Sequence, residues 1–391
     1  MTIQTQDPTQ RLGRRYYFTD SDMDLFFVGA LSYGPAGGLE IGQAFYVASQ
    51  IEDGNPDSWV EAFTNYGAAL DAQADAWLER GWTQAAGEMR LKAAASYRSA
   101  WQFSEAGAPF LSIYVKERAA FARSMTELKL PVTSFDVPYG ASYLPGMFVQ
   151  NPNRQAPVIL IIGGADTGFQ DLFLSYGRKL YERGYSVAIA DLPGQGDRAG
   201  SGLHWEVQSE LSIGAITDVL VNRFGAVPGK MALMGVSLGG YFVTRAAGYE
   251  TRFAAVIAST PFPNPGEMFA RATEAGKVAA FAGDAVSQAA QRGRKILAWK
   301  AGATTPEELV AKTSAMVADP TLVTQPFLSV VGGGESPIFL KQARDWHNAI
   351  RSERKDFVTL DAATGADGHC QVNNRLRLVQ EVDGWLSEVL S

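Results

Sequence analysis

The spacing of hydrophobic positions in this chain changes near residue 130. From about residue 22 to residue 125, apolar and aromatic residues recur every three or four positions, which is typical of amphipathic helices. After Leu130, short apolar runs alternate with helix-length segments, and this pattern predicts a doubly wound, mostly parallel sheet. Between Pro261 and Pro320 the alternation stops and the spacing is helical again. We therefore expect a helical N-terminal accessory domain at 1–129 and an α/β domain at 130–391, with a helical lid insertion at 261–320.

The individual segments follow from the same pattern. Strands are expected at 132–137, 144–149, 158–162, 186–190, 231–235, 255–259, 327–331 and 357–360. Helices are expected at 172–183, 205–224, 268–281, 284–299, 338–350 and 372–389, and the polar residues 1–20 are expected to form a loose arm. Most aromatic residues of the N-terminal helices are expected to pack in a core, although Phe26, Phe27, Tyr33 and Trp101 could instead line a substrate cavity.

A Gly-x-Ser-x-Gly sequence joins the strand at 231–235 to the next helix and contains Ser237. In this context the motif predicts a nucleophile elbow, a sharp turn that places the serine hydroxyl at the top of the sheet. Glycines are needed two residues before and after the serine because side chains there would collide with the neighbouring strand and helix. Ser237 is therefore the candidate nucleophile, with the Leu238 amide directed to the same point and Tyr241 as a candidate substrate contact.

A serine nucleophile requires a base, and the base requires an orienting acid. The turn-rich loop before the last helix supplies His369 as the candidate base. The candidate acid is Glu335, which follows the strand at 327–331, and Asp361, one strand later, is the alternative. His204 follows a glycine-rich turn and could approach the pocket as a substrate contact.

The sequence Gly-Gly-Ala-Asp-Thr at 163–167 follows a buried strand and can supply the rest of the site. An oxyanion hole needs two convergent N–H groups, for which we expect the amides of Leu238 and Ala165. Gly164 and Thr167 are expected to contact the substrate. Asp166 has two interpretations, because it could cap the following helix or act on the substrate as a proton carrier.

Composition narrows the class of protein. A hydrophobic content of 46% and a charged content of 19% are ordinary for a soluble globular chain, and a net charge of -7 argues against a nucleic-acid partner. One cysteine excludes an intramolecular disulfide, and three histidines with one cysteine make a metal site unexpected, so no metal and no cofactor are predicted. Without a visible signal peptide or a membrane-length apolar run, we expect a cytoplasmic protein with no membrane partner.

These motifs, together with Asp-Leu-Pro-Gly-Gln-Gly at 191–196, make the whole chain resemble one branch of the α/β-hydrolases. The branch comprises the 2,6-dihydroxypseudooxynicotine hydrolases and the polyketide-shortening hydrolases, with esterase-like fermentation–respiration-switch proteins as relatives. The resemblance implies that the N-terminal helices close the active site, that the protein forms a homodimer, and that a carbon–carbon bond next to a carbonyl is cleaved. The chain departs from the branch at Asp166, where glutamate is expected, and at Glu335, where aspartate is commoner.

The resulting hypothesis is a serine hydrolase that cleaves a carbon–carbon bond beside a carbonyl in a ketone or polyketide-like small molecule. A carboxylesterase, a thioesterase or an acyl-transferring cyclase of a biosynthetic pathway would use the same residues. A non-catalytic binding protein on a hydrolase fold is the alternative from a different class.

Overall fold

The computed structural model describes residues 10–282 and 286–390, and within them the chain forms an eight-stranded sheet in the order β1-β2-β4-β3-β5-β6-β7-β8. Strand β2 is antiparallel to both of its neighbours, and the pairs from β4 to β8 are parallel. The strands are β1 Val132–Tyr139, β2 Ser142–Val149, β3 Val158–Ile162, β4 Ser186–Ala190, β5 Met231–Val236, β6 Phe253–Ser259, β7 Phe327–Gly332 and β8 Lys355–Leu360. The predicted doubly wound sheet is confirmed.

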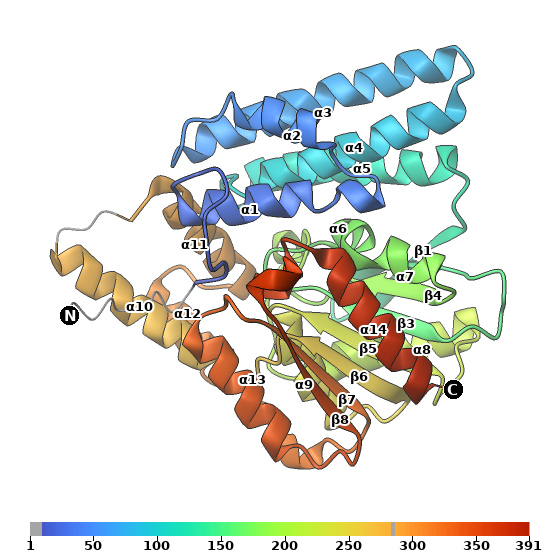
Figure 1. Cartoon of the computed structure of the whole chain (residues 1–391), viewed down its shortest axis with the longest axis vertical. Helices are drawn as coiled ribbons and strands as arrows, with labels where there is room; N and C mark the ends of the chain where they lie inside the picture. Colours follow the sequence, from blue (N-terminus) through green and yellow to red (C-terminus); the bar gives the residue numbers. More distant parts are fainter. Residues whose placement is uncertain (1–9, 283–285, 391) are drawn as a thin grey trace.

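Helices cover both faces of the sheet (Figure 1). Successive side chains of a strand point to opposite faces, so β3 contributes Ile159 and Ile161 to one core and Leu160 and Ile162 to the other. The core that contains Leu160 also includes residues of α8 Ser209–Phe224, α9 Gly239–Ala247 and α13 Pro337–Ala349. The core that contains Ile159 includes residues of α7 Arg178–Glu182 and α14 Arg375–Val389.

The N-terminal part of the chain is helical and packs above the sheet (Figure 1). Many of its large aromatic side chains, including Trp59 and Trp101, are buried in the same core as Ile159 of the sheet. This packing buries the apolar faces of the N-terminal helices against the sheet layer. The helices are α1 Ser21–Leu31, α2 Ile41–Ala48, α3 Pro56–Glu79, α4 Thr83–Trp101 and α5 Ala108–Glu127.

Among the described residues between β6 and β7, where the lid insertion was expected, the chain forms the α-helices α10 Pro265–Ala282, α11 Gln288–Ala301 and α12 Pro306–Thr313. The expected helix at 268–281 lies within α10. The expected start of the next helix at Asp284 lies outside the described residues. Helix α11 packs against α1 and α3, so this insertion meets the N-terminal helices beside the sheet (Figure 1).

Two expectations are wrong in detail. The helix expected at 172–183 is instead the short helix α6 Phe169–Leu172, a π-helical turn at Phe173–Gly177 and α7. The loose arm expected at 1–20 is not found at residues 10–20, where Leu12 is buried and backbone hydrogen bonds tie the segment to distant loops. Among the described residues, no helix is long and apolar enough to cross a membrane.

Candidate active site

Ser237 lies in the sharp turn between β5 and α9, with a left-handed φ of 57°. A Cβ atom at Gly235 would lie 2.3 Å from the Gly239 carbonyl oxygen, and one at Gly239 would lie 2.6 Å from the Ile162 carbonyl oxygen. Neither contact is sterically possible, so both glycines of the motif are required by the fold. The Ser237 amide donates a 2.8 Å hydrogen bond to the Ser259 carbonyl, which fixes the turn against β6.

His369 connects Ser237 to a buried carboxylate. Its Nε2 atom lies 3.0 Å from Ser237 Oγ, and its Nδ1 atom contacts the carboxylate of Glu335. Glu335 is held in turn by the Thr260 hydroxyl, at 2.8 and 2.7 Å from its two oxygens, and by the Gly332 amide at 3.1 Å. The three side chains therefore form a continuous series of polar contacts.

The alternative acid, Asp361, is elsewhere. Its exposed side chain accepts hydrogen bonds from the Ala363 and Thr364 amides and caps a short helical turn. Glu335 is thus the carboxylate that contacts His369. Burial by itself lowers the pKa of His369, but the adjacent Cys370 and Glu335 stabilise the imidazolium, and the pKa is raised above its usual 6.5.

The loop after β3 lies directly against Ser237. A Cβ atom at Gly164 would lie 2.5 Å from Ser237 Cβ, so only glycine allows this approach. Gln195 Nε2 donates a 3.0 Å hydrogen bond to the Gly164 carbonyl and supports the loop from behind. Within the described part of the chain, the amides of Ala165 and Leu238 donate no hydrogen bond, so both are available to a developing oxyanion.

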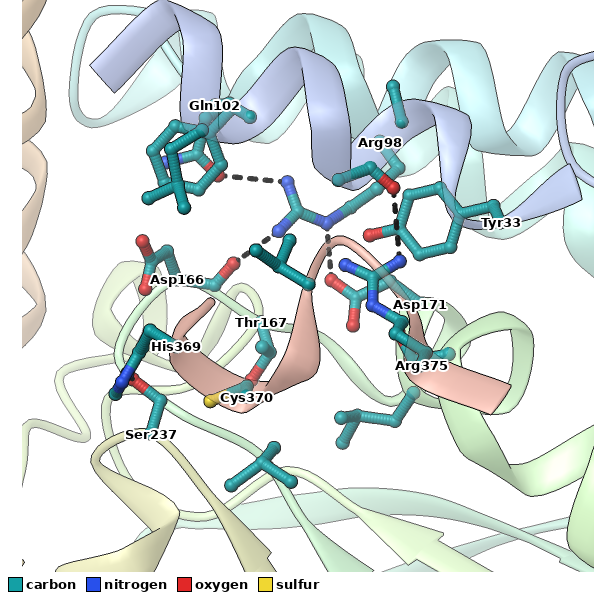
Figure 2. A pocket seen from close by; sticks show the side chains of 18 of the residues that line it. Tyr33, Arg98, Gln102, Asp166, Thr167, Asp171, Ser237, His369, Cys370 and Arg375 are labelled. Atoms are coloured by element: carbon teal, nitrogen blue, oxygen red, sulfur yellow. Dashed lines mark hydrogen bonds and ion pairs between the residues drawn. The ribbon is translucent and has the colours of Figure 1, made fainter. Parts of the chain in front are cut away.

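The site opens into a cavity that is covered by the N-terminal helices (Figure 2). Ser237, His369, Asp166 and Thr167 line it, whereas Gly164, the other expected substrate contact of this loop, is not among the lining residues. Of the four aromatic residues that could have lined a cavity, Phe26 and Tyr33 do so, whereas Phe27 and Trp101 are buried in the helical core.

Asp166 faces this cavity and does not cap a helix. Its Oδ2 atom lies 3.6 Å from Nη1 of Arg11, and its backbone carbonyl accepts a 2.6 Å hydrogen bond from Arg98 Nη2. The N-cap position of α6 belongs to Gly168 instead. The structure therefore favours the interpretation in which the carboxylate is within the substrate cavity.

His204 and Tyr241 are not brought to the cavity. The Tyr241 hydroxyl donates a 2.7 Å hydrogen bond to the Val207 carbonyl and ties α9 to the start of α8. The His204 ring packs against Gly302, where a Cβ atom would lie 2.7 Å from it. Neither Tyr241, on α9, nor His204, in the loop before α8, is among the residues that line the cavity.

Several cavity residues were missed by reasoning on the sequence. Arg11 comes from the segment expected to be a loose arm, and its backbone carbonyl accepts a 2.8 Å hydrogen bond from the His369 amide. Arg98 is buried in α4, where an arginine on an Ala-rich helix face was the available signal. Arg375, at the start of α14, carries no motif. Within the described ranges, no group of three or more His, Cys, Asp or Glu side chains is arranged to hold a metal ion.

This fold and elbow define an α/β-hydrolase. The sequence matches the family described as serine aminopeptidase, S33, over residues 152–364, more than half of the chain, and the chain belongs to that family. It therefore belongs to the α/β-hydrolase class of proteins.

Two curated relatives illustrate the sequence similarity. The chain is 28% identical over 266 residues to hydrolyase poxO of Penicillium oxalicum. The aligned region covers 63% of this chain and 62% of that protein. It is 28% identical over 245 residues to 20-hydroxy-prefusarin hydrolase FUS2 of Gibberella moniliformis, covering 59% of this chain and 58% of that one. The chain thus spans about three fifths of the length of these relatives.

Solved structures extend the similarity to almost the whole chain. The 2,6-dihydroxy-pseudo-oxynicotine hydrolase superposes with a TM-score of 0.73 at 17% identity, covering 93% of this chain and 95% of that one. AbyA5 superposes with a TM-score of 0.62 at 17% identity, covering 94% and 99%. At these identities the similarity is one of fold, and it includes the N-terminal helices. The resemblance inferred from the motifs is confirmed.

Proposed function

We propose that this hydrolase cleaves a carbon–carbon bond next to a carbonyl in a ketone or polyketide-like small molecule. The observation that carries the proposal is the series of contacts Ser237–His369–Glu335, which opens into a cavity covered by the N-terminal helices. Ser237 is the proposed nucleophile, His369 the base and Glu335 the residue that orients the imidazole. The amides of Leu238 and Ala165 are the proposed oxyanion hole.

The proposed reaction begins with attack of Ser237 Oγ on one carbonyl of a β-diketone while His369 takes the hydroxyl proton. Collapse of the tetrahedral intermediate breaks the carbon–carbon bond, and its electron pair leaves as an enolate of the second carbonyl. The proton on His369 is then transferred to this enolate. Water, activated by His369, hydrolyses the remaining acyl-enzyme to a carboxylic acid and frees Ser237.

Asp166 supports cleavage of a carbon–carbon bond over cleavage of an ester. An alkoxide leaving group needs a proton only from His369, whereas an enolisable substrate must also be held in its reactive tautomer. Asp166 lines the cavity together with Ser237, and this position supports the proposed role. An ester or thioester hydrolase with the same nucleophile is the second proposal. It ranks second because ester hydrolysis has no use for Asp166.

The test compares a β-diketone with a p-nitrophenyl ester on the full chain. Ser237→Ala is expected to lower kcat by roughly three to six decades on both substrates. Asp166→Asn is expected to lower turnover of the diketone by about two decades and to leave the ester nearly unaffected, because p-nitrophenolate needs no proton. Absence of diketone cleavage with strong esterase activity would favour the second proposal. Turnover of both substrates by Ser237→Ala would exclude the proposed nucleophile.

A further inference from the structure

One side of the cavity presents polar groups that no protein atom satisfies. Figure 2 shows Tyr33 and Arg375 across the cavity from Ser237 and His369. Tyr33 follows α1, Arg375 begins α14, and Ser175, a third lining residue, lies in the π-helical turn. Within the described part of the chain, the hydroxyls of Tyr33 and Ser175 make no hydrogen bond, although both residues are more than 90% buried. Both residues line the cavity, so their hydroxyls are available to a bound ligand.

Arg375 is held in place but retains free donors. Its Nη1 atom donates a 3.0 Å hydrogen bond to the Gly29 carbonyl, and its guanidinium carbon lies 4.2 Å from the centroid of the Tyr33 ring. A guanidinium carries five N–H donors, so most of them remain available. The cation is therefore positioned by α1 and Tyr33 with unused hydrogen-bonding capacity.

The charge balance on this side of the cavity is positive. Arg98 pairs with Asp171 and is further satisfied by Gln102 at 2.9 Å and by the Asp166 carbonyl. Arg375 forms no ion pair with any carboxylate in the described ranges. Two guanidiniums thus face one carboxylate, and a partly buried cation without a counter-charge favours an anionic ligand.

The carboxylates beside the nucleophile already have a cationic partner. There Arg11 lies 2.7 Å from Asp22 and 3.6 Å from Asp166, so two carboxylates share one guanidinium. Asp166 and Asp22 are thus already matched by a cation, whereas Arg375 has no carboxylate partner within the described ranges. An anionic group of a substrate would therefore be attracted to Arg375, the cation without a carboxylate partner.

We propose that Arg375, Tyr33 and Ser175 form a subsite for an anionic oxygen, a carboxylate or an enolate, on the part of the substrate that lies across the cavity from the attacked carbonyl. The inference rests on the proposed function, because it takes Ser237 as the point of attack, and it narrows the substrate class to acidic ketones and acids. Charge-assisted hydrogen bonds from a guanidinium and two hydroxyls are suited to this group.

The experiment uses pairs of p-nitrophenyl esters that differ only in charge. The mono-p-nitrophenyl esters of succinic, glutaric and adipic acids are compared with the same compounds capped as methyl esters. The wild-type enzyme is expected to prefer at least one acidic ester by tenfold or more in kcat/KM, mainly through KM. Arg375→Gln is expected to reduce that preference about 10- to 100-fold, the scale for loss of a hydrogen bond to a charged group. Tyr33→Phe, which keeps the ring beneath the guanidinium, is expected to reduce it less.

Arg377→Gln is the matched control. Arg377 lies on the same helix, two residues further along, and pairs with Glu381 away from the cavity, so its replacement should leave the preference unchanged. Melting temperatures identify any variant that fails to fold, and if Arg375→Gln does so, Tyr33→Phe and Arg375→Lys decide the question. Equal hydrolysis of acidic and neutral esters by the wild type, or an unchanged preference in the folded subsite variants, would overturn the subsite. Those results would leave the proposed function intact as long as hydrolysis of the neutral esters still depends on Ser237.

Discussion

At the scale of single residues, the site depends on how one carboxylate is held. Glu335 accepts hydrogen bonds from Thr260 and Gly332 while it contacts His369 Nδ1, so its position is fixed from two elements besides its own loop. A glutamate side chain is one carbon longer than an aspartate side chain. The structure accommodates that length because the carboxylate folds back onto the Gly332 amide at the end of β7.

This arrangement predicts a pH effect of Glu335→Gln. Neutral His369 is the active base, so kcat/KM should rise with pH as the imidazolium, whose pKa is raised by Cys370 and Glu335, loses its proton. Removing the carboxylate charge should move the midpoint of this rise to lower pH and reduce kcat by about two to four decades. Asp361→Asn is the control and should leave the profile unchanged. The prediction is checked by measuring pH–rate profiles of both variants. If Asp361→Asn, and not Glu335→Gln, causes these changes, the assignment of the acid to Glu335 is wrong.

At the scale of elements, residues 10–13 act as a strap across the catalytic loops. The Gln10 carbonyl accepts a 3.0 Å hydrogen bond from Ser336, beside Glu335, and the Arg11 carbonyl accepts one from His369. Leu12 anchors the strap in a small apolar cluster with Leu25, Val28 and Val372. The strap thus connects the acid loop, the histidine loop and α1.

Leu12→Ala should therefore lower kcat/KM clearly while it changes the melting temperature little. Loss of the anchor would release the strap locally, and small displacements of catalytic groups cost about ten- to a hundredfold in rate. We expect kcat/KM to fall by that factor while the melting temperature changes little, because the cluster is separate from the main cores. Leu211→Ala, at an exposed position of α8, is the control. Full activity in Leu12→Ala would show that the strap does not position the loops.

At the scale of the whole molecule, buried ionisable groups lie where the helical layer, the sheet and the lid insertion meet. Burial, together with Asp171, raises the pKa of Glu117 in α5 to about 8, and the Trp101 indole donates a 2.5 Å hydrogen bond to it. Burial also raises the pKa of Asp191, after β4, to about 7. Burial lowers the pKa of Lys300, in α11, to about 8. The proposed accessory domain at 1–129 therefore contacts the rest of the chain through a region that contains buried polar groups. The homodimer and the cytoplasmic location remain predictions.

These pKa values predict how stability depends on pH. A carboxyl group whose pKa is raised in the folded state binds its proton more tightly there than in the unfolded state. Its contribution to the free energy of unfolding is therefore lost as the pH rises from about 5 to about 8. The free energy of unfolding should fall over this interval. Glu117→Gln removes one of these titrating carboxyl groups. The decrease in the free energy of unfolding should then be smaller by on the order of 1–2 kcal/mol. Urea unfolding at pH 5 and pH 8 measures the difference, and Glu105→Gln, at an exposed position, provides the control. Identical pH dependence in the wild type and Glu117→Gln would contradict the prediction.

The sequence by itself determined the features that depend on local pattern. Buried parallel strands read as short apolar runs, so each strand was predicted close to its observed position. The elbow was predictable because Gly235 and Gly239 are required by collisions within one short turn. His369 and Glu335 were predictable because each follows a recognisable strand or precedes a recognisable helix.

Only the tertiary structure decided which distant residues share the cavity. Arg11, Tyr33, Arg98 and Arg375 lie far apart along the chain and carry no shared periodicity, yet they line one cavity. The same holds for the misplaced candidates, since Tyr241 lies four residues from Ser237 but points its hydroxyl at Val207. The physical reason is that a strand or helix is selected by local hydrophobic spacing, whereas the composition of a cavity depends on how the helical layer packs on the sheet, which no local spacing encodes.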